Sequence, residues 1–325
     1  MTLIGGPERD ARRDFAEDVR AGLTSRPKWL SARHLYDARG SALFAEICEQ
    51  PEYYPTRTEG AILREIAPQL AARFDRAPQL VELGSGSAEK TRALIEALIA
   101  RHGDLTYEPI DISRSALELS AEELLADYPE LDVYAVADEY LPGLRRLAEI
   151  PERSESPRLI VWLGSSIGNF HREEAARFLT VLRGSLRPED RLLVGFDRRK
   201  GAPELEAAYD DGAGVTAAFI RNLLDRIDRE FGSDFGSAAW SFQARYDEEL
   251  GRVEMTLECP DARRVAIPEL DMDVPFEAGE RIHMENSYKY SEGEIRALAD
   301  TAGLRVLEHW TDPDERFCEV LFATR

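Results

Sequence analysis

The sequence predicts an α/β protein with a doubly wound, mostly parallel sheet, helices on both faces of it, and a second, smaller domain. Short apolar runs rich in strand-forming residues alternate with amphipathic helical patterns, which is typical of parallel sheets. This rhythm stops after Asp197 and resumes at Ser291, so the residues between them are interpreted as an insertion. Strands of the main sheet are expected at 79–84, 106–111, 131–137, 158–164 and 191–197.

The start of the chain is expected to join the smaller domain. Thr56 and Glu59 have the T-x-x-E spacing of a capping box, which predicts a helix beginning there, and Pro55 supports a boundary at the same place. The larger domain is therefore expected to comprise 61–199 and 290–325, and the smaller one 1–60 and 200–289.

Helix and strand signals follow one another through the insertion and the C-terminal part. A long helix is expected from about Glu204 to Phe231, followed by a hairpin over 240–259 and strand-like segments at 263–274 and 280–290. Ser291 and Glu294 form a capping box that opens a helix, and Gly303 closes it. The runs at 305–310 and 317–323 are expected to complete the first sheet.

Composition excludes several classes of partner. The net charge is −21, from 62 acidic and 41 basic residues, so the surface repels nucleic acid and anionic lipid, and neither is an expected partner. No apolar run reaches the roughly 20 residues that span a bilayer, and the first residues lack the apolar core of a secretory signal. Three scattered cysteines indicate a reducing, cytoplasmic location, and five histidines without ligand spacing predict no metal.

The segment "GSGSAEKT" at 84–91 nearly matches two nucleotide-binding patterns and fails both at one residue. Glu89 stands where the phosphate loop G-x-x-x-x-G-K-[ST] has its second glycine, and where the dinucleotide pattern G-x-G-x-x-G has its third. A carboxylate at that position repels a polyphosphate. The turn therefore allows close backbone approach to a ligand but disfavours a dense anion.

A ligand with an adenosine and no phosphate suits this turn, and S-adenosylmethionine is such a ligand. Asp111 ends the second strand, where it could bind the ribose diol, and Asp138 follows the third strand, where it could accept from the adenine amino group. Lys90 could meet the carboxylate of the cofactor. Each acid alone is more typical of a loop charge or a helix cap, but together with the glycine turn they indicate a methyltransferase.

Several longer strings carry a more specific likeness. They are "LYDARGSALFAEICEQPEYYPTRTE" (35–59), "LVELGSGSAEKTR" (80–92), "LGSSIGNF" (163–170), "AYDDGAGVTAAFIRN" (208–222) and "MENSYKY" (284–290). On these strings the sequence resembles the bacterial L-histidine Nα-methyltransferases of ergothioneine biosynthesis, which form hercynine (trimethylhistidine). The resemblance implies a class I S-adenosylmethionine-dependent methyltransferase core (Rossmann-like), a smaller substrate-binding domain, a free L-histidine substrate and no metal.

The resemblance also implies a set of site residues. Cofactor contacts are expected at Gly84, Lys90, Asp111, Asp138 and Glu139. Substrate contacts are expected at Tyr53, Asn169, Tyr209, Met255, Glu285 and Ser287, with Met255 lining the imidazole pocket. Tyr36 and Asn169 are the catalytic candidates, Tyr36 because its string lies where cofactor and amine should meet. The sequence departs from the family pattern at Asn286, Tyr288 and Tyr290, where relatives have more apolar residues, which bears on side-chain selectivity.

Strand geometry gives one of these pairs a physical basis. Glu285 and Ser287 are two residues apart, so on a strand they face the same side and can converge on one imidazole ring. Spacing alone is more typical of an exposed strand with an alternating polar face, and the resemblance of the flanking residues favours the binding role. Asn169 is likewise a common turn residue, and Tyr209 could pack as a helix aromatic. No histidine stands out as a general base, so we expect the proton to leave through water or a tyrosine hydroxyl.

Other functions remain open at this point. They are an N-methyltransferase for another amino acid or small amine, a protein methyltransferase, a cofactor-sensing module without activity, and a nicotinamide-dependent oxidoreductase. The sequence leaves the oligomeric state open, with a monomer as the working expectation.

Overall fold

The computed structural model describes residues 1–5, 11–150 and 156–325, and the chain divides into two compact units. Unit 1 comprises Met1–Pro7, Pro55–Arg199 and Lys289–Arg325, and unit 2 comprises Glu8–Tyr54 and Lys200–Tyr288. Each unit has a hydrophobic core of its own. Among the described residues no helix is both long and apolar enough to cross a membrane.

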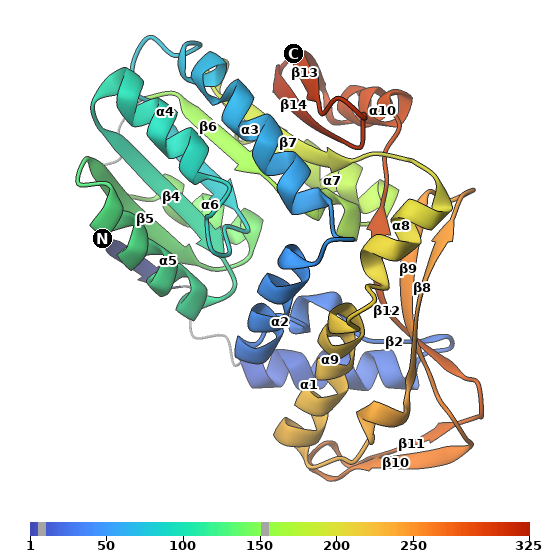
Figure 1. The fold of residues 1–325 in the computed structure, drawn as a ribbon. Coiled ribbons are helices and arrows are strands. Elements are labelled where there is room, and N and C mark those ends of the chain that lie inside the picture. The colour runs from blue at the N-terminus through green and yellow to red at the C-terminus, as the bar shows by residue number, and fades with distance from the viewer. Residues whose placement is uncertain (6–10, 151–155) are drawn as a thin grey trace. The chain divides into compact units, whose positions relative to one another are not determined.

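Unit 1 is built on an eight-stranded sheet in the order β1-β5-β4-β3-β6-β7-β14-β13 (Figure 1). The strands from β1 to β7 in this order pair in parallel, whereas β14 pairs antiparallel with both β7 and β13. The predicted doubly wound α/β fold is therefore confirmed, including the two closing strands. Their bounds are Thr2–Gly5 (β1), Gln79–Leu83 (β3), Leu105–Asp111 (β4), Leu131–Ala137 (β5), Arg158–Trp162 (β6), Arg191–Asp197 (β7), Leu304–Thr311 (β13) and Phe317–Thr324 (β14).

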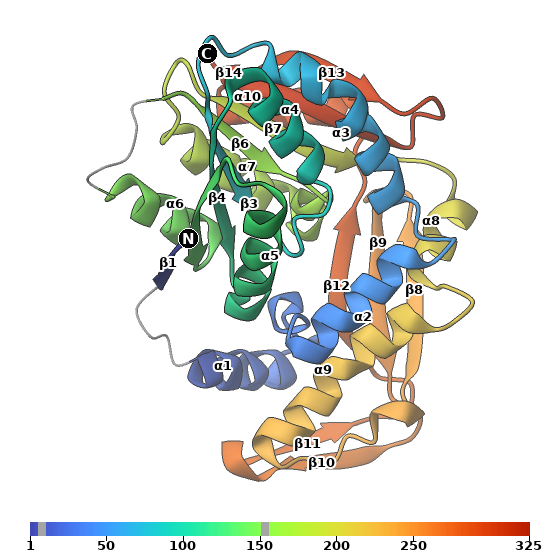
Figure 2. The ribbon, with the colours of Figure 1, turned by 60° about the vertical axis from the view of Figure 1, so that its left-hand side comes forward.

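Helices cover both faces of this sheet. Helices α3, α4 and α5 lie on one face, and α6, α7 and α10 lie on the other (Figure 2). The predicted capping box of Ser291 and Glu294 is present at the start of α10, and Gly303 ends that helix with φ +68°. The helix bounds are Pro55–Ala71 (α3), Arg92–His102 (α4), Arg114–Asp127 (α5), Tyr140–Ala148 (α6), Arg172–Arg183 (α7) and Glu292–Ala302 (α10).

The strand order reverses between β3 and β6, and we call the region outside the carboxyl ends of these two strands the crevice. From β3 the chain continues to β4 and β5 toward one edge of the sheet, and from β6 it continues to β7 toward the other edge. Doubly wound sheets bind their ligands outside the carboxyl ends of the strands at such a reversal of order. The loop 84–91 follows β3, and the loop that begins at Leu163 follows β6, so these two loops border the crevice.

The N-terminal boundary differs from the predicted one. Strand β1 pairs with β5, so the first residues belong to unit 1 and not to the smaller unit. Helix α3 begins at Pro55, a residue well suited to the first helical position, so the unit boundary falls before Pro55 and not after residue 60. The predicted capping box is wrong, because Thr56 lies inside the helix and Glu59 binds other partners, which are described below.

Unit 2 combines helices with a four-stranded sheet in the order β2-β12-β9-β8 and a separate hairpin of β10 and β11. The predicted hairpin over 240–259 is confirmed as β8 and β9. The strands are Lys28–Trp29 (β2), Ser241–Asp247 (β8), Arg252–Glu258 (β9), Arg263–Ile267 (β10), Met272–Phe276 (β11) and Arg281–Tyr288 (β12). The helices are Ala11–Thr24 (α1), Ala38–Glu49 (α2), Ala202–Tyr209 (α8) and Val215–Phe231 (α9).

The long helix predicted from Glu204 to Phe231 is wrong, because it is interrupted between α8 and α9. The Asp211 carboxylate accepts the backbone N–H groups of Val215 and Thr216, both at 2.8 Å, and so caps the start of α9. Gly214 precedes that helix with φ +75°, a conformation that glycine adopts without strain. The break leaves Tyr209 at the end of α8.

Candidate active site

The turn after β3 is shaped by two glycines in the left-handed region, Gly84 with φ +75° and Gly86 with φ +51°. A Cβ on Gly84 would lie 2.9 Å from the Tyr140 hydroxyl, so this position has no room for a side chain. The Gly86 N–H donates to the Asp111 carboxylate at 3.0 Å, and the Ser113 N–H donates to the other oxygen at 2.8 Å. Asp111 thus ties the loop after β3 to the loop after β4.

Burial shifts the pKa values of two side chains at this turn, Asp111 and Tyr140. It raises the pKa of Asp111 above its ordinary value of 3.8, although the backbone hydrogen bonds act in the opposite direction. It also raises the pKa of Tyr140 to about 12, with a further contribution from the Asp111 charge. Tyr140 packs edge-on against Trp162 and Phe178, so its hydroxyl is held at the turn as a neutral group. Sequence reasoning missed Tyr140, whose signal is its position directly after Glu139.

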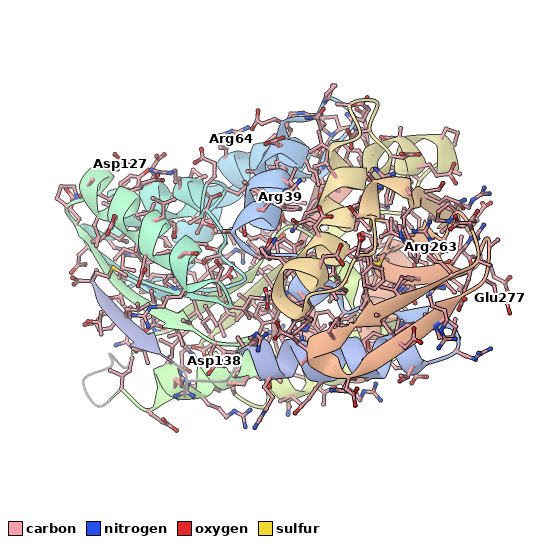
Figure 3. The ribbon with its side chains drawn as sticks, turned by 90° about the horizontal axis from the view of Figure 1, so that it is seen from below. Arg39, Arg64, Asp127, Asp138, Arg263 and Glu277 are labelled. Carbon is pink, nitrogen blue, oxygen red and sulfur yellow. The ribbon has the colours of Figure 1, made fainter. Side chains whose placement is uncertain are left out.

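Asp138 and Glu139 lie between β5 and α6, and Asp138 is labelled in Figure 3. The Asp138 carboxylate accepts the Glu139 N–H at 2.8 Å and pairs with Arg146 on α6 at 2.6 Å. Glu139 occupies the N-cap position of α6. The oxygen expected to accept from an adenine amino group therefore belongs to a carboxylate that is already shared with Arg146.

Lys90 is paired inside unit 1. Its ammonium contacts the fully buried carboxylate of Glu59, and a Cβ on Gly164 would lie 3.3 Å from the lysine nitrogen. Burial is the largest single effect on Lys90 and lowers its pKa, but the charge and hydrogen bond of Glu59, together with the charges of Glu82 and Glu319, raise this pKa above its ordinary 10.5. Sequence reasoning assigned Glu59 to a helix cap and so missed its position at the crevice.

Asn169 lies on the other border of the crevice, at the end of the 3₁₀ turn Ser166–Asn169, and is exposed. The turn is anchored by Ser165, whose φ is +53° and whose hydroxyl accepts the Asp197 N–H at 2.9 Å. Unit 1 thus carries Asn169 together with all five expected cofactor residues. The other expected residues are in unit 2.

In unit 2, the paired strands β9 and β12 bring together three expected substrate residues. Glu285 lies opposite Met255, and Ser287 lies opposite Val253. The register shifts between His283 and Glu285, so one residue is extra there. This bulge changes the alternation and turns Glu285 and Ser287 toward the face that carries Met255 and the core of unit 2.

Tyr209 connects Ser287 to a row of aromatic residues. The hydroxyls of Tyr209 and Ser287 lie 2.8 Å apart, and the Tyr209 ring packs edge-on against Tyr53 with centroids 6.0 Å apart. Phe44 contacts Tyr53 on one side and Tyr36 on the other, at 6.4 Å and 5.6 Å. The expected residues Tyr36, Tyr53, Tyr209 and Ser287 are therefore linked by a continuous series of contacts.

Helix α9 fixes the loop that carries Tyr36. Phe219 on this helix packs against the Tyr36 ring at 5.4 Å, and Asn222 donates to the Asp37 carboxylate at 2.8 Å. The same carboxylate accepts the Gly40 N–H and caps α2. Sequence reasoning missed Phe44, Phe219 and Asn222, which the helical spacing alone presents as ordinary packing residues.

Asn286, Tyr288 and Tyr290, the three positions that depart from the family pattern, make contacts of their own. Asn286 contacts His283 at 3.2 Å and Tyr288 accepts from Arg252 at 3.2 Å, both on the opposite face of β12 from Glu285. Tyr290 is in unit 1, where the Arg172 guanidinium lies 4.0 Å from its ring centroid.

Comparison with known proteins decides the family. The family described as histidine-specific methyltransferases, SAM-dependent, matches residues 15–324. The chain belongs to this family. As a histidine-specific methyltransferase family member, it is an S-adenosylmethionine-dependent N-methyltransferase, and the resemblance seen in the sequence is confirmed.

Two individual relatives and one solved structure are similar to this methyltransferase. Histidine N-alpha-methyltransferase of Mycolicibacterium smegmatis is 41% identical over 298 residues, which cover 91% of this chain and 90% of the relative. Ergothioneine biosynthesis protein 1 of Neurospora crassa is 33% identical over 92% of this chain and 34% of its own length. A solved magnesium protoporphyrin IX methyltransferase from Synechocystis with bound SAH is 11% identical, with a TM-score of 0.48 over 90% of this chain and 97% of that one. The predicted class I core and S-adenosylmethionine as methyl donor are confirmed by the family.

Proposed function

We propose that this methyltransferase transfers three methyl groups in succession from S-adenosylmethionine to the α-nitrogen of L-histidine, forming hercynine for ergothioneine biosynthesis. The observation that carries the proposal is the placement of Glu285 and Ser287 on one face of β12 beside Met255, with the Tyr209 hydroxyl on Ser287. The names of the two curated relatives support the same substrate and pathway. The proposal includes a cytoplasmic monomer and a reaction without metal.

The imidazole ring is assigned to the polar pair on β12. Glu285 accepts one ring N–H, and Ser287, held by Tyr209, bonds the other nitrogen. Both side chains are buried, so an amino acid without ring nitrogens cannot form the two hydrogen bonds that they offer to the ring, which disfavours its binding. Met255, opposite Glu285, supplies the apolar edge of the pocket.

The α-amino end is assigned to Tyr36, Tyr53 and Asn169. In each step the nitrogen lone pair forms the N–C bond while the S–C bond breaks, and S-adenosylhomocysteine leaves. A proton leaves the nitrogen before each transfer, through water or a tyrosine hydroxyl. The product keeps a permanent positive charge, and a tyrosine ring face stabilises such a cation by about 0.5–2 kcal/mol. Asn169 binds the carboxylate of histidine.

The cofactor is assigned to the turn after β3 and its neighbours. Gly84 and Gly86 let the backbone approach it closely, Asp111 binds its ribose diol, and Asp138 with Glu139 binds the adenine. Lys90 meets its carboxylate while keeping the Glu59 contact. S-adenosylmethionine supplies the electrophilic methyl group, and its net positive charge suits the acidic groups of this crevice.

Mass spectrometry of L-histidine incubated with the protein and S-adenosylmethionine tests the proposal. We expect histidine carrying one, two and finally three methyl groups, at an unchanged rate when a chelator is present. Glu285→Ala should reduce the yield strongly under the same conditions. Product confined to another amino acid, or no product in the presence of bound cofactor, would refute it.

A further inference from the structure

We propose that Glu59 and Glu319 are positioning residues of the cofactor site: Glu319 acts as a neutral acid that donates to Glu59, and Glu59 holds both borders of the crevice in place. The inference deepens the proposed function, because it assigns roles to two buried acids that no step of methyl transfer uses. Neither residue belongs to the expected cofactor or substrate set.

Glu59 contacts the loops on both sides of the crevice. One carboxylate oxygen accepts the Gly164 N–H at 2.6 Å, in the loop after β6. The other oxygen contacts the Lys90 ammonium, in the loop after β3. Because these strands are neighbours at the reversal of strand order, a single side chain on α3 fixes the two segments between which a doubly wound sheet binds its ligand.

The carboxyl group of Glu319 lies next to that of Glu59, beside Gly195. It is on β14, opposite Gly195 of β7 in the register, and it is fully buried. A Cβ on Gly195 would collide with an oxygen of Glu59 and lie 3.0 Å from an oxygen of Glu319, so the missing side chain leaves the space that both carboxyl groups occupy. A glycine is therefore needed at position 195 because a side chain would not fit, and not because of the backbone conformation.

The surroundings of Glu319 require a proton on it. Among the described residues neither of its oxygens meets an N–H or O–H donor, and the carboxyl group of Glu59 is next to it in the space beside Gly195. Two buried carboxylates cannot bond each other without a shared proton. Burial and the Glu59 charge raise the pKa of Glu319 well above its usual 4.5, while the Lys90 charge has a smaller effect in the opposite direction. Glu319 is therefore a hydrogen-bond donor at neutral pH.

A proton on Glu319 also balances the charges of Lys90 and the acids around it. Lys90 is a single cation near three acids, Glu59, Glu82 and Glu319. Glu82 has its own donors, Thr91 at 2.7 Å and Tyr107. With Glu319 neutral, the Glu59 carboxylate pairs one to one with Lys90, and the ammonium stays beside Gly164.

The matched pair Glu59→Gln and Glu319→Gln tests this assignment, with the exposed Glu122→Gln as control. Glutamine at 59 keeps an oxygen for Gly164 but loses the charge that holds Lys90, so we expect S-adenosylmethionine to bind roughly tenfold more weakly or worse by calorimetry. Glutamine at 319 is neutral and keeps a donor, so binding should stay within about threefold of wild type. Glu59→Gln should add little in a Lys90→Met background, because the two residues act as one pair.

Infrared difference spectra give a direct readout of the proton. Wild type minus Glu319→Gln should show a carboxylic-acid carbonyl band at neutral pH. The assignment is overturned if that band is absent, if Glu319→Gln weakens cofactor binding as much as Glu59→Gln, or if folded Glu59→Gln binds like wild type. Should Glu59→Gln not fold, the infrared band and the Glu319→Gln affinity still decide. Cofactor affinity is measured without histidine, so a failure of the histidine assignment leaves this test intact.

Discussion

The Tyr209 hydroxyl lies 2.8 Å from the Ser287 hydroxyl and joins the end of α8 to the C-terminal end of β12. This contact depends on the break between α8 and α9, because an unbroken helix would not place Tyr209 at a helix end. It also depends on the bulge before Glu285, which turns Ser287 toward this face. Two local irregularities thus position residues that we assign to the binding of histidine.

Tyr209→Phe should raise the KM for histidine by about 2- to 10-fold, because one neutral hydrogen bond to Ser287 is lost. Ser287→Ala should have a similar or larger effect, and the double variant should be little worse than Ser287→Ala alone. Steady-state kinetics at saturating cofactor measures this. Fully additive effects would contradict a shared role, and Tyr128→Phe on unit 1 serves as the control.

Glu285→Ala should lower kcat/KM for histidine by about 10- to 100-fold, because a hydrogen bond to a buried carboxylate is lost. Affinity for S-adenosylmethionine should stay unchanged. Glu254→Ala is the matched control, since Glu254 lies on the neighbouring strand but faces the opposite side with Asn286. Histidine kinetics that respond equally to both substitutions would show that the face of the strand is irrelevant to recognition.

Gly84→Ala should weaken cofactor binding and lower the melting temperature. The new Cβ would lie 2.9 Å from the Tyr140 hydroxyl, and the φ of +75° is strained for alanine. Adding Tyr140→Phe should recover part of the affinity by removing the contact. Gly103→Ala is the control, because Gly103 also has positive φ but open space around it. Equal losses of cofactor affinity at Gly84 and Gly103 would mean that backbone strain alone is responsible.

The stability of the protein should fall between about pH 4.5 and pH 7 through Glu82. Burial raises the pKa of Glu82 from 4.5 to about 7, although Tyr107 and Thr91 donate to it. In this window the unfolded chain has lost the proton that the folded chain keeps, so the free energy of unfolding decreases by up to about 3 kcal/mol as pH rises. Denaturant titrations at several pH values should show a flatter profile for Glu82→Gln. A profile identical to wild type would contradict the assignment.

The central strands β3, β6 and β7 were predictable because each is a short, mainly apolar run that is bounded by turn residues and buried along almost its whole length. The Ser291 capping box and the Gly303 stop were equally visible, since both act within their own helix. Glu59 was misread because a T-x-x-E spacing looks the same whether the carboxylate reaches its own helix end or, as here, Gly164. Its partners come from distant parts of the chain, which no local pattern reveals.

The residues that we assign to histidine in unit 2 were proposed from the sequence, but the contacts that hold them in place were not. The prediction of one helix over 204–231 overlooked a break signal, since Asp211, Gly212 and Gly214 are cap and turn residues and the Asp211 carboxylate does cap α9. The bulge before Glu285 has no glycine to mark it, and the packing of Phe44 and Phe219 around Tyr36 resembles ordinary core.

One competition assay addresses the central proposal most directly. The protein is incubated with S-adenosylmethionine carrying a deuterated methyl group and an equimolar mixture of the common amino acids, and all products are identified by mass spectrometry. We predict that the label accumulates on histidine, ending with three deuterated methyl groups on its α-nitrogen. Label on a different amino acid, or on an imidazole nitrogen of histidine, would contradict the proposal.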